Sequence, residues 1–176
     1  RRTLSYPAIR TFIKTELCRV ILENYETPDV IAGVATGAIA QGAMVADALG
    51  LPYIYVRSTP KDHGLENLIE GQLTHGQKVM VIEDLISTGG SVLEAVDALR
   101  EAGAEVLGIV SIFTYGMKKG AERLAAANVH NVSLTNFDCI AEVAAETGYI
   151  RPADVARLLA FRRNPSDESW IHAHEA

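Results

Sequence analysis

An apolar strand that runs directly into two acids, a glycine-rich turn and an amphipathic helix constrains this chain most strongly. The segment covers residues 78–103 and reads KVMVIEDLISTGGSVLEAVDALREAG. Its apolar run at 79–82 is typical of a strand buried on both faces of a parallel sheet. We expect Glu83 and Asp84 to stand where this strand ends. Ligands of open α/β sheets bind beyond the carboxyl ends of the strands, so the acid pair is predicted to lie in a binding site.

The turn after the acid pair has a composition that suits a phosphate. Glycine lets the backbone approach a ligand closely, and N–H groups at the start of a helix can surround an anion. Carboxylates just upstream can accept hydrogen bonds from both hydroxyls of a ribose. The segment therefore predicts a site for a phosphorylated sugar. The residues of the turn are Ser87, Thr88, Gly89, Gly90 and Ser91.

Two other interpretations fit parts of this segment. Ser91 and Glu94 have the spacing of a helix capping box,. An acid pair before a turn is also common in solvated loops. The order of acids, hydroxyls and glycines between a buried strand and a helix favours phosphoribosyl binding over both.

The rest of the chain alternates between strand and helix patterns. Ser5 and Pro7 suit the start of a helix whose apolar residues continue to Ile21, and Gly50 and Gly103 suit helix ends,. This alternation predicts an α/β fold with a mostly parallel central sheet flanked by helices. We expect strands at 30–34, 52–56, 79–82, 106–113 and 129–134, and further helices at 39–49, 91–102, 120–127, 137–145 and 152–161.

A second turn of small residues follows the first predicted strand. Thr36, Gly37 and Ala38 offer backbone N–H groups at the start of a helix, where an anion can bind,. Tight packing between strand and helix explains the same residues equally well. The pattern is neither the G-x-G-x-x-G motif of dinucleotide-binding proteins nor a Walker A motif, which argues against dinucleotide binding and against nucleoside-triphosphatase activity.

The regular pattern disappears between residues 57 and 72, where polar and turn residues dominate. Such connections are often binding loops or lids. Arg57, Lys61 and His63 place three cationic or protonatable groups here, which suits stabilisation of a departing anion. A solvated surface loop is the alternative.

Length and charge narrow the possible functions. The chain has 176 residues and a net charge of −6, which suits one domain and argues against an extended nucleic-acid or membrane surface,. No apolar run approaches the roughly 20 residues that span a bilayer. Cys18 and Cys139 match no metal spacing and suit a reducing compartment, so we expect a cytoplasmic protein. We expect a single domain at 1–165 and a tail at 166–176.

The sequence VIEDLISTGGS resembles the phosphoribosyl-diphosphate signature of the type I phosphoribosyltransferases, and residues 4–165 resemble the orotate phosphoribosyltransferases. The resemblance implies transfer of phosphoribosyl from 5-phosphoribosyl 1-diphosphate to orotate in pyrimidine (UMP) biosynthesis, giving orotidine 5′-monophosphate and diphosphate. It also implies Mg²⁺ held mainly through substrate with no direct protein ligand, and a homodimer whose lid residues reach the neighbouring site.

The same resemblance assigns residues. Lys61, Glu83 and Asp84 are the implied catalytic residues, and Ser87 and Tyr115 are the implied orotate contacts. The implied phosphoribosyl-diphosphate contacts are Thr36, Gly37, Arg57, Lys61, His63, Glu83, Asp84, Leu85, Ile86, Ser87, Thr88, Gly89, Gly90 and Ser91.

The chain departs from the family pattern in three places. Ser58 stands where many members carry a second lysine, and no arginine follows the strand at 106–113. In place of that arginine, Tyr115 is a candidate to line the base pocket and Lys118 is a candidate to approach the orotate carboxylate. Packing or surface roles fit both residues as well. The amino-terminal base-pocket segment is also absent, so the sequence looks truncated there. Because of these departures, two alternatives stay open. The chain transfers phosphoribosyl to another base, or it is a regulator that senses phosphoribosyl diphosphate without turnover.

Overall fold

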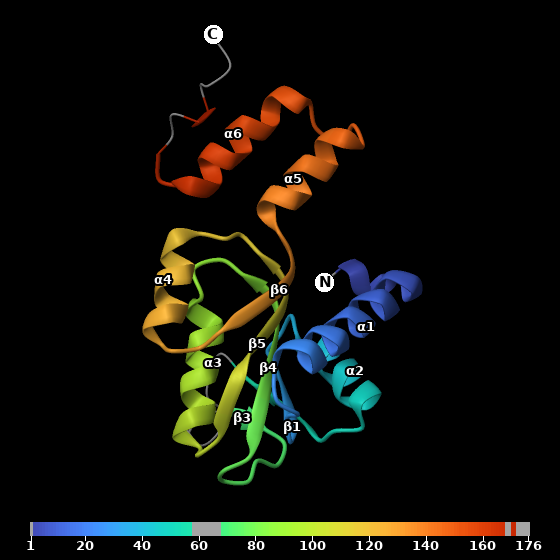
Figure 1. Ribbon diagram of the computed structural model, residues 1–176, viewed down its shortest axis with the longest axis vertical. Helices are drawn as coiled ribbons and strands as arrows, with labels where there is room; N and C mark the ends of the chain where they lie inside the picture. Colours follow the sequence, from blue (N-terminus) through green and yellow to red (C-terminus); the bar gives the residue numbers. More distant parts are fainter. Residues whose placement is uncertain (1, 58–67, 168–169, 172–176) are drawn as a thin grey trace.

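The computed structural model describes residues 2–57, 68–167 and 170–171, and within them the chain forms a sheet with the strand order β3-β2-β1-β4-β5-β6 (Figure 1). β1, β2, β4, β5 and β6 pair in parallel, whereas β3 pairs antiparallel with β2. This arrangement confirms the predicted α/β fold with a mostly parallel sheet. The strands are β1 (Val30–Val34), β2 (Tyr53–Val56), β3 (Ile69–Glu70), β4 (Lys78–Ile86), β5 (Glu105–Thr114) and β6 (Asn131–Asn136).

Helices cover both faces of the sheet (Figure 1). α1 and α2 lie on one face, α3 and α4 lie on the other, and α5 and α6 pack on each other beyond the end of β6. No helix among the described residues is long and apolar enough to cross a membrane. The helices are η1 (Arg2–Ser5), α1 (Pro7–Asn24), α2 (Ile39–Leu49), α3 (Gly90–Glu101), α4 (Lys118–Ala126), α5 (Phe137–Glu146) and α6 (Pro152–Arg163).

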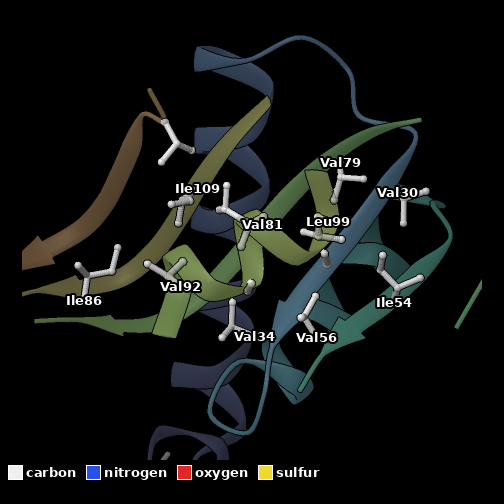
Figure 2. Close-up of a cluster of buried hydrophobic side chains, with 14 residues drawn as sticks. Val30, Val34, Ile54, Val56, Val79, Val81, Ile86, Val92, Leu99 and Ile109 are labelled. Carbon is white, nitrogen blue, oxygen red and sulfur yellow. The ribbon is translucent and has the colours of Figure 1, made fainter. Parts of the chain in front are cut away.

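The apolar core forms two layers, one on each face of the sheet. Successive side chains of a strand point to opposite faces. In β4, Val79 and Val81 join the cluster under α3 that Figure 2 shows, whereas Met80 and Ile82 join the cluster under α1 and α2. All four side chains are fully buried, which explains why the run is apolar at every position,.

The end of β4 differs from the prediction. The strand continues through Glu83 and Asp84 to Ile86, because β5 pairs with it as far as Ile86 opposite Thr114. The pairing with β1 reaches only Ile82. The acid pair therefore lies inside the strand, but beyond the last residue that pairs with β1.

Four further expectations from the sequence, including the alternative of a capping box, differ from the structure. The capping box is not formed, because Gly89 is the N-cap of α3 and Ser91 lies inside the helix. The N-cap of α1 is Tyr6 rather than Ser5, which lies in η1. A short strand, β3, lies within the segment expected to be loop, because its backbone pairs with the edge of β2. The last strand is also displaced, at Asn131–Asn136 rather than 129–134.

Candidate functional site

Two turns lie side by side at the carboxyl edge of the sheet, because β1 and β4 are parallel neighbours. The chain leaves β1 after Val34 into the turn that precedes α2. The acid pair of β4 follows Ile82, the last residue that pairs with β1. Adjacent parallel strands thus bring residues from two distant segments to one crevice.

Asp84 and Gly37 make the contact that joins these turns. The carboxylate of Asp84 lies so close to the Cα atom of Gly37 that a Cβ atom there would overlap it. Asp84 is half-buried, and Thr36 beside Gly37 is exposed. The peptide bond between Ala35 and Thr36 is cis. The predicted diol-binding acid and the predicted second anion turn therefore belong to one site.

Glu83 is the buried member of the acid pair, with 3% of its surface exposed. Its Oε1 atom accepts a hydrogen bond of 2.8 Å from the backbone N–H of Asp84. Burial raises the pKa of Glu83 to about 8, and the side chain of Asp84 acts in the same direction, whereas the backbone N–H of Asp84 lowers this pKa in part,. The two acids are therefore different in kind, since Asp84 is open to a ligand while Glu83 supports it from behind.

The glycine-rich turn leads into α3 as predicted. Gly89 has a φ of 76°, a left-handed conformation that glycine adopts without strain,. Among the described residues, no side chain caps the first turn of this helix. The N–H groups of that turn therefore lack a side-chain acceptor there, at the positive end of the helix dipole. This geometry suits the phosphate site that the sequence predicts.

Helix α4 supports the same turn, which the sequence interpretation did not anticipate. A Cβ atom at Gly120 would lie 2.5 Å from the backbone oxygen of Ser87, so the helix packs closely against the turn. The Nη1 atom of Arg123 donates a hydrogen bond of 3.3 Å to the backbone oxygen of Thr88. The only sequence signal for this contact is the small residue Gly120 inside a helix.

The other residues of the signature are placed by the sheet. The side chain of Ile86 is buried in the core, whereas that of Leu85 is exposed. Both residues lie in β4 and pair with β5. Their contribution to a ligand site is therefore limited to their backbone groups and, for Leu85, an apolar surface.

Arg57 follows β2 and lies on the crevice edge of the sheet. Its Nη1 atom is 3.4 Å from Oε1 of Glu70, and both side chains are partly exposed. Its backbone N–H donates to the oxygen of Leu68. The other predicted lid residues, Lys61 and His63, and the departure at Ser58 lie outside the described residues.

The candidates for base recognition have partners of their own. The ring of Tyr115 stacks on Phe137 at 5.6 Å and meets the edge of Phe113 at 5.1 Å. Lys118 is exposed and lies 3.7 Å from the carboxylate of Glu122. Ser87 lines a cavity of about 400 Å³ next to the turn. Tyr115 therefore packs among aromatic rings and Ser87 lines a cavity, and contact of either residue with orotate stays a prediction.

This fold, with an acid pair and two turns that precede helices at one edge of the sheet, is that of an α/β protein of the phosphoribosyltransferase class. The profile of the family described as Phosphoribosyl transferase domain matches residues 10–145. The chain therefore belongs to the phosphoribosyltransferase family.

Curated relatives narrow this assignment. Orotate phosphoribosyltransferase of Bacteroides thetaiotaomicron is 58% identical over 166 residues, which cover 94% of this chain and 78% of that protein. Orotate phosphoribosyltransferase of Bacillus cereus is 54% identical over 173 residues, which cover 98% and 82%. Within the family, the chain belongs with the orotate phosphoribosyltransferases of pyrimidine biosynthesis.

Solved structures agree with the fold. Orotate phosphoribosyltransferase from Aeropyrum pernix superposes with a TM-score of 0.74 at 29% identity, covering 85% of this chain and 82% of that one. The Mycobacterium tuberculosis orotate phosphoribosyltransferase in complex with 5-phospho-α-D-ribosyl 1-diphosphate gives a TM-score of 0.65 at 26% identity, covering 78% of each chain.

Proposed function

We propose that this chain transfers the phosphoribosyl group of 5-phosphoribosyl 1-diphosphate to N1 of orotate. The bond between C1 of the sugar and the diphosphate oxygen breaks, and a bond between C1 and N1 forms. The products are orotidine 5′-monophosphate and diphosphate. The observation that supports this proposal is the contact between Asp84 and Gly37, because it brings the acid proposed to bind the sugar beside the turn proposed to bind the leaving anion.

The acid pair and the glycine-rich turn hold the phosphoribosyl group. The half-buried Asp84 accepts hydrogen bonds from the ribose hydroxyls, and Glu83 supports its backbone and reaches the sugar from behind. The N–H groups at 88–91, at the uncapped start of α3, bind the 5′-phosphate,. Negative charge on Asp84 also favours the oxocarbenium-like sugar as the leaving group departs, while Glu83 keeps its proton below pH 8,.

The leaving diphosphate is bound by the opposite turn and by cations. Thr36 and Gly37 provide backbone N–H groups, and Arg57, Lys61 and His63 provide positive charge. Orotate already carries an acidic N1, so the reaction needs no dedicated general base. Catalysis then rests on positioning and electrostatic stabilisation.

Mg²⁺ would be held in this site mainly through the hard oxygen atoms of the substrate. Among the described residues, no group of three or more His, Cys, Asp or Glu side chains is placed to hold a metal ion. Mg²⁺ beside phosphates keeps few protein ligands, so the substrate oxygen atoms would be sufficient without a direct protein ligand. The bound ion would neutralise charge on the diphosphate.

We further propose that the chain acts in the cytoplasm as a homodimer whose 57–72 segment reaches the neighbouring site. The family resemblance supports this assembly. Sedimentation of the purified protein with and without substrate tests it, and a species that remains monomeric at the assay concentration contradicts it.

An assay of diphosphate release tests the reaction itself. The purified chain is incubated with phosphoribosyl diphosphate, Mg²⁺ and either orotate, uracil or adenine. We expect release with orotate and background release with the other two bases. Preferential release with another base identifies a different transferase, and substrate binding without release identifies a sensor.

A further inference from the structure

A second concave site adjoins the glycine-rich turn. It is a cleft of about 730 Å³ between the start of α4 and the end of α6, and we call it the α4–α6 cleft. Figure 1 shows the end of α6 lying over the start of α4. Its lining includes Ser87 and Thr88 at the border of the turn, and the cations Lys118, Lys119, Arg162 and Arg163.

The cleft is positive in a chain whose net charge is −6. Glu122 is the acid in its lining, and it pairs with Lys118 at 3.7 Å. Among the described residues, Lys119 and Arg163 have no ion-pair partner, and both are exposed. Cations gathered in a concave surface raise the local concentration of anions.

Arg162 fixes the geometry of the cleft. Its Nη2 atom lies 2.7 Å from Oδ2 of Asp138, and its side chain is 23% exposed. The Nη1 atom donates a weak hydrogen bond of 3.5 Å to the backbone oxygen of Gly116. Its Nε atom is buried and makes no hydrogen bond within the part of the chain that the structure describes. Arg162 thus ties the end of α6 to the residues just before α4.

We propose that the α4–α6 cleft binds the polyphosphate group of a small anion. Lysine ammonium groups and the planar fork of arginine both match phosphate oxygens. The volume lies within the usual range for small-ligand sites, about 300–1,000 Å³. Met117 and Pro165 in the lining offer apolar contacts for an organic group attached to the phosphates.

This inference goes beyond the transferase reaction, because the cleft's cations come from α4 and α6 rather than from the acid pair or the turn. Ser87 and Thr88 border both sites. Negative charge in the cleft therefore lies close to the proposed 5′-phosphate position. Occupation of the cleft weakens phosphoribosyl-diphosphate binding by like-charge repulsion, which makes the cleft regulatory.

Calorimetric titration with tripolyphosphate tests the proposal. Tripolyphosphate is added, without Mg²⁺, to protein saturated with phosphoribosyl diphosphate. The cleft variant is Lys119→Ala/Arg163→Ala. The control, Arg2→Ala/Lys14→Ala, removes the same charge from η1 and α1 on the other side of the molecule (Figure 1).

We expect one tripolyphosphate to bind to the saturated protein. The cleft variant weakens this binding by about tenfold or more, because each cation provides a charge-assisted hydrogen bond to phosphate. The control changes it by less than about twofold, as distant exposed charges are screened. The cleft variant keeps the wild-type KM for phosphoribosyl diphosphate in the absence of added anion.

Two results overturn the proposal: loss of tripolyphosphate binding when phosphoribosyl diphosphate is saturating, or equal weakening by the cleft and control variants. A parallel titration with ATP identifies the source of the phosphates. Tighter binding of ATP supports a nucleotide, and equal binding supports the phosphate chain alone. If phosphoribosyl diphosphate does not bind to the protein, the transferase proposal fails. The cleft proposal is then tested on the protein without phosphoribosyl diphosphate, where weaker tripolyphosphate binding by the cleft variant than by the wild type still supports it.

Discussion

The Cα atom of Gly37 lies directly against the carboxylate of Asp84, leaving no room for a side chain between the two turns. β1 delivers one of these residues and β4 delivers the other, and the two strands are parallel neighbours. The acid proposed to bind the sugar hydroxyls and the turn proposed to bind the leaving anion are thereby held at one point. The geometry of the proposed site follows from the strand order rather than from proximity in the sequence.

The substitution Gly37→Ala tests this contact. The added Cβ atom displaces either the Asp84 carboxylate or the turn, so we expect KM for phosphoribosyl diphosphate to rise by about tenfold or more,. Steady-state kinetics measure the change. The thermal unfolding midpoint is the control, and it should stay close to wild type because the site lies at the crevice edge. A wild-type KM would show that the contact has no role in binding.

Asp84→Asn tests the role of the open acid. The amide keeps the size of the side chain but loses its charge, so binding of the ribose hydroxyls should weaken by about 1.5–3 kcal/mol. Calorimetric titration with phosphoribosyl diphosphate measures the loss. The fold should be unaffected, since Asp84 is only half-buried. Equal affinity in the variant and the wild type would remove Asp84 from diol binding.

Glu83→Gln tests the buried acid through pH. The folded pKa of about 8 lies above the ordinary value of 4.5, so the folded protein holds a proton that the unfolded chain has released. The resulting stability is fully present below pH 4.5 and is lost as pH rises through 8,.

Between about pH 5 and pH 9, the free energy of unfolding of the wild type should therefore fall by roughly 2–4 kcal/mol relative to Glu83→Gln. Urea unfolding of both proteins at several pH values measures this difference. Curves that run parallel across the range would contradict the raised pKa.

Arg123→Ala tests the support that α4 gives to the turn. Loss of the hydrogen bond to Thr88 should loosen the turn and raise KM for phosphoribosyl diphosphate by about three- to tenfold, with little change in kcat,. Arg100→Ala is the matched control, because Arg100 also donates to backbone oxygens, those of Ala127 and Asn128, away from the turn. A similar KM in both variants would show that Arg123 has no specific role.

Lys61→Ala tests the proposed lid. Removing this cation should lower kcat more than it weakens orotate binding, because the charge acts on the departing diphosphate. The comparison of kcat with the orotate dissociation constant separates these effects, and Lys14→Ala is a control for general charge loss. Unchanged turnover would exclude Lys61 from the mechanism.

The sequence predicts the features that depend on local pattern. The continuous apolar run at 79–82 predicts a strand buried on both faces, and Val81 and Met80 do point into opposite core layers. The glycine at position 103 has the left-handed backbone expected just beyond a helix,. The place of the acids near the end of a central strand also follows from their order in the sequence.

Features set by distant partners are not predictable in this way. β4 extends to Ile86 because β5 supplies hydrogen-bonding partners that far, and β3 exists because two residues pair with β2. Gly89 rather than Ser91 begins α3, so a good capping pattern was misleading. The contact between Arg123 and Thr88 joins the last turn of α4 to the turn before α3, and only the folded sheet brings these two segments together.

A crystal structure with orotidine 5′-monophosphate tests the central claim most directly. We predict that the ribose hydroxyls lie within hydrogen-bonding distance of the Asp84 carboxylate, and that the phosphate oxygens contact the backbone N–H groups at 88–91. A phosphate bound in the α4–α6 cleft or against Gly37, with the sugar away from Asp84, would contradict the account.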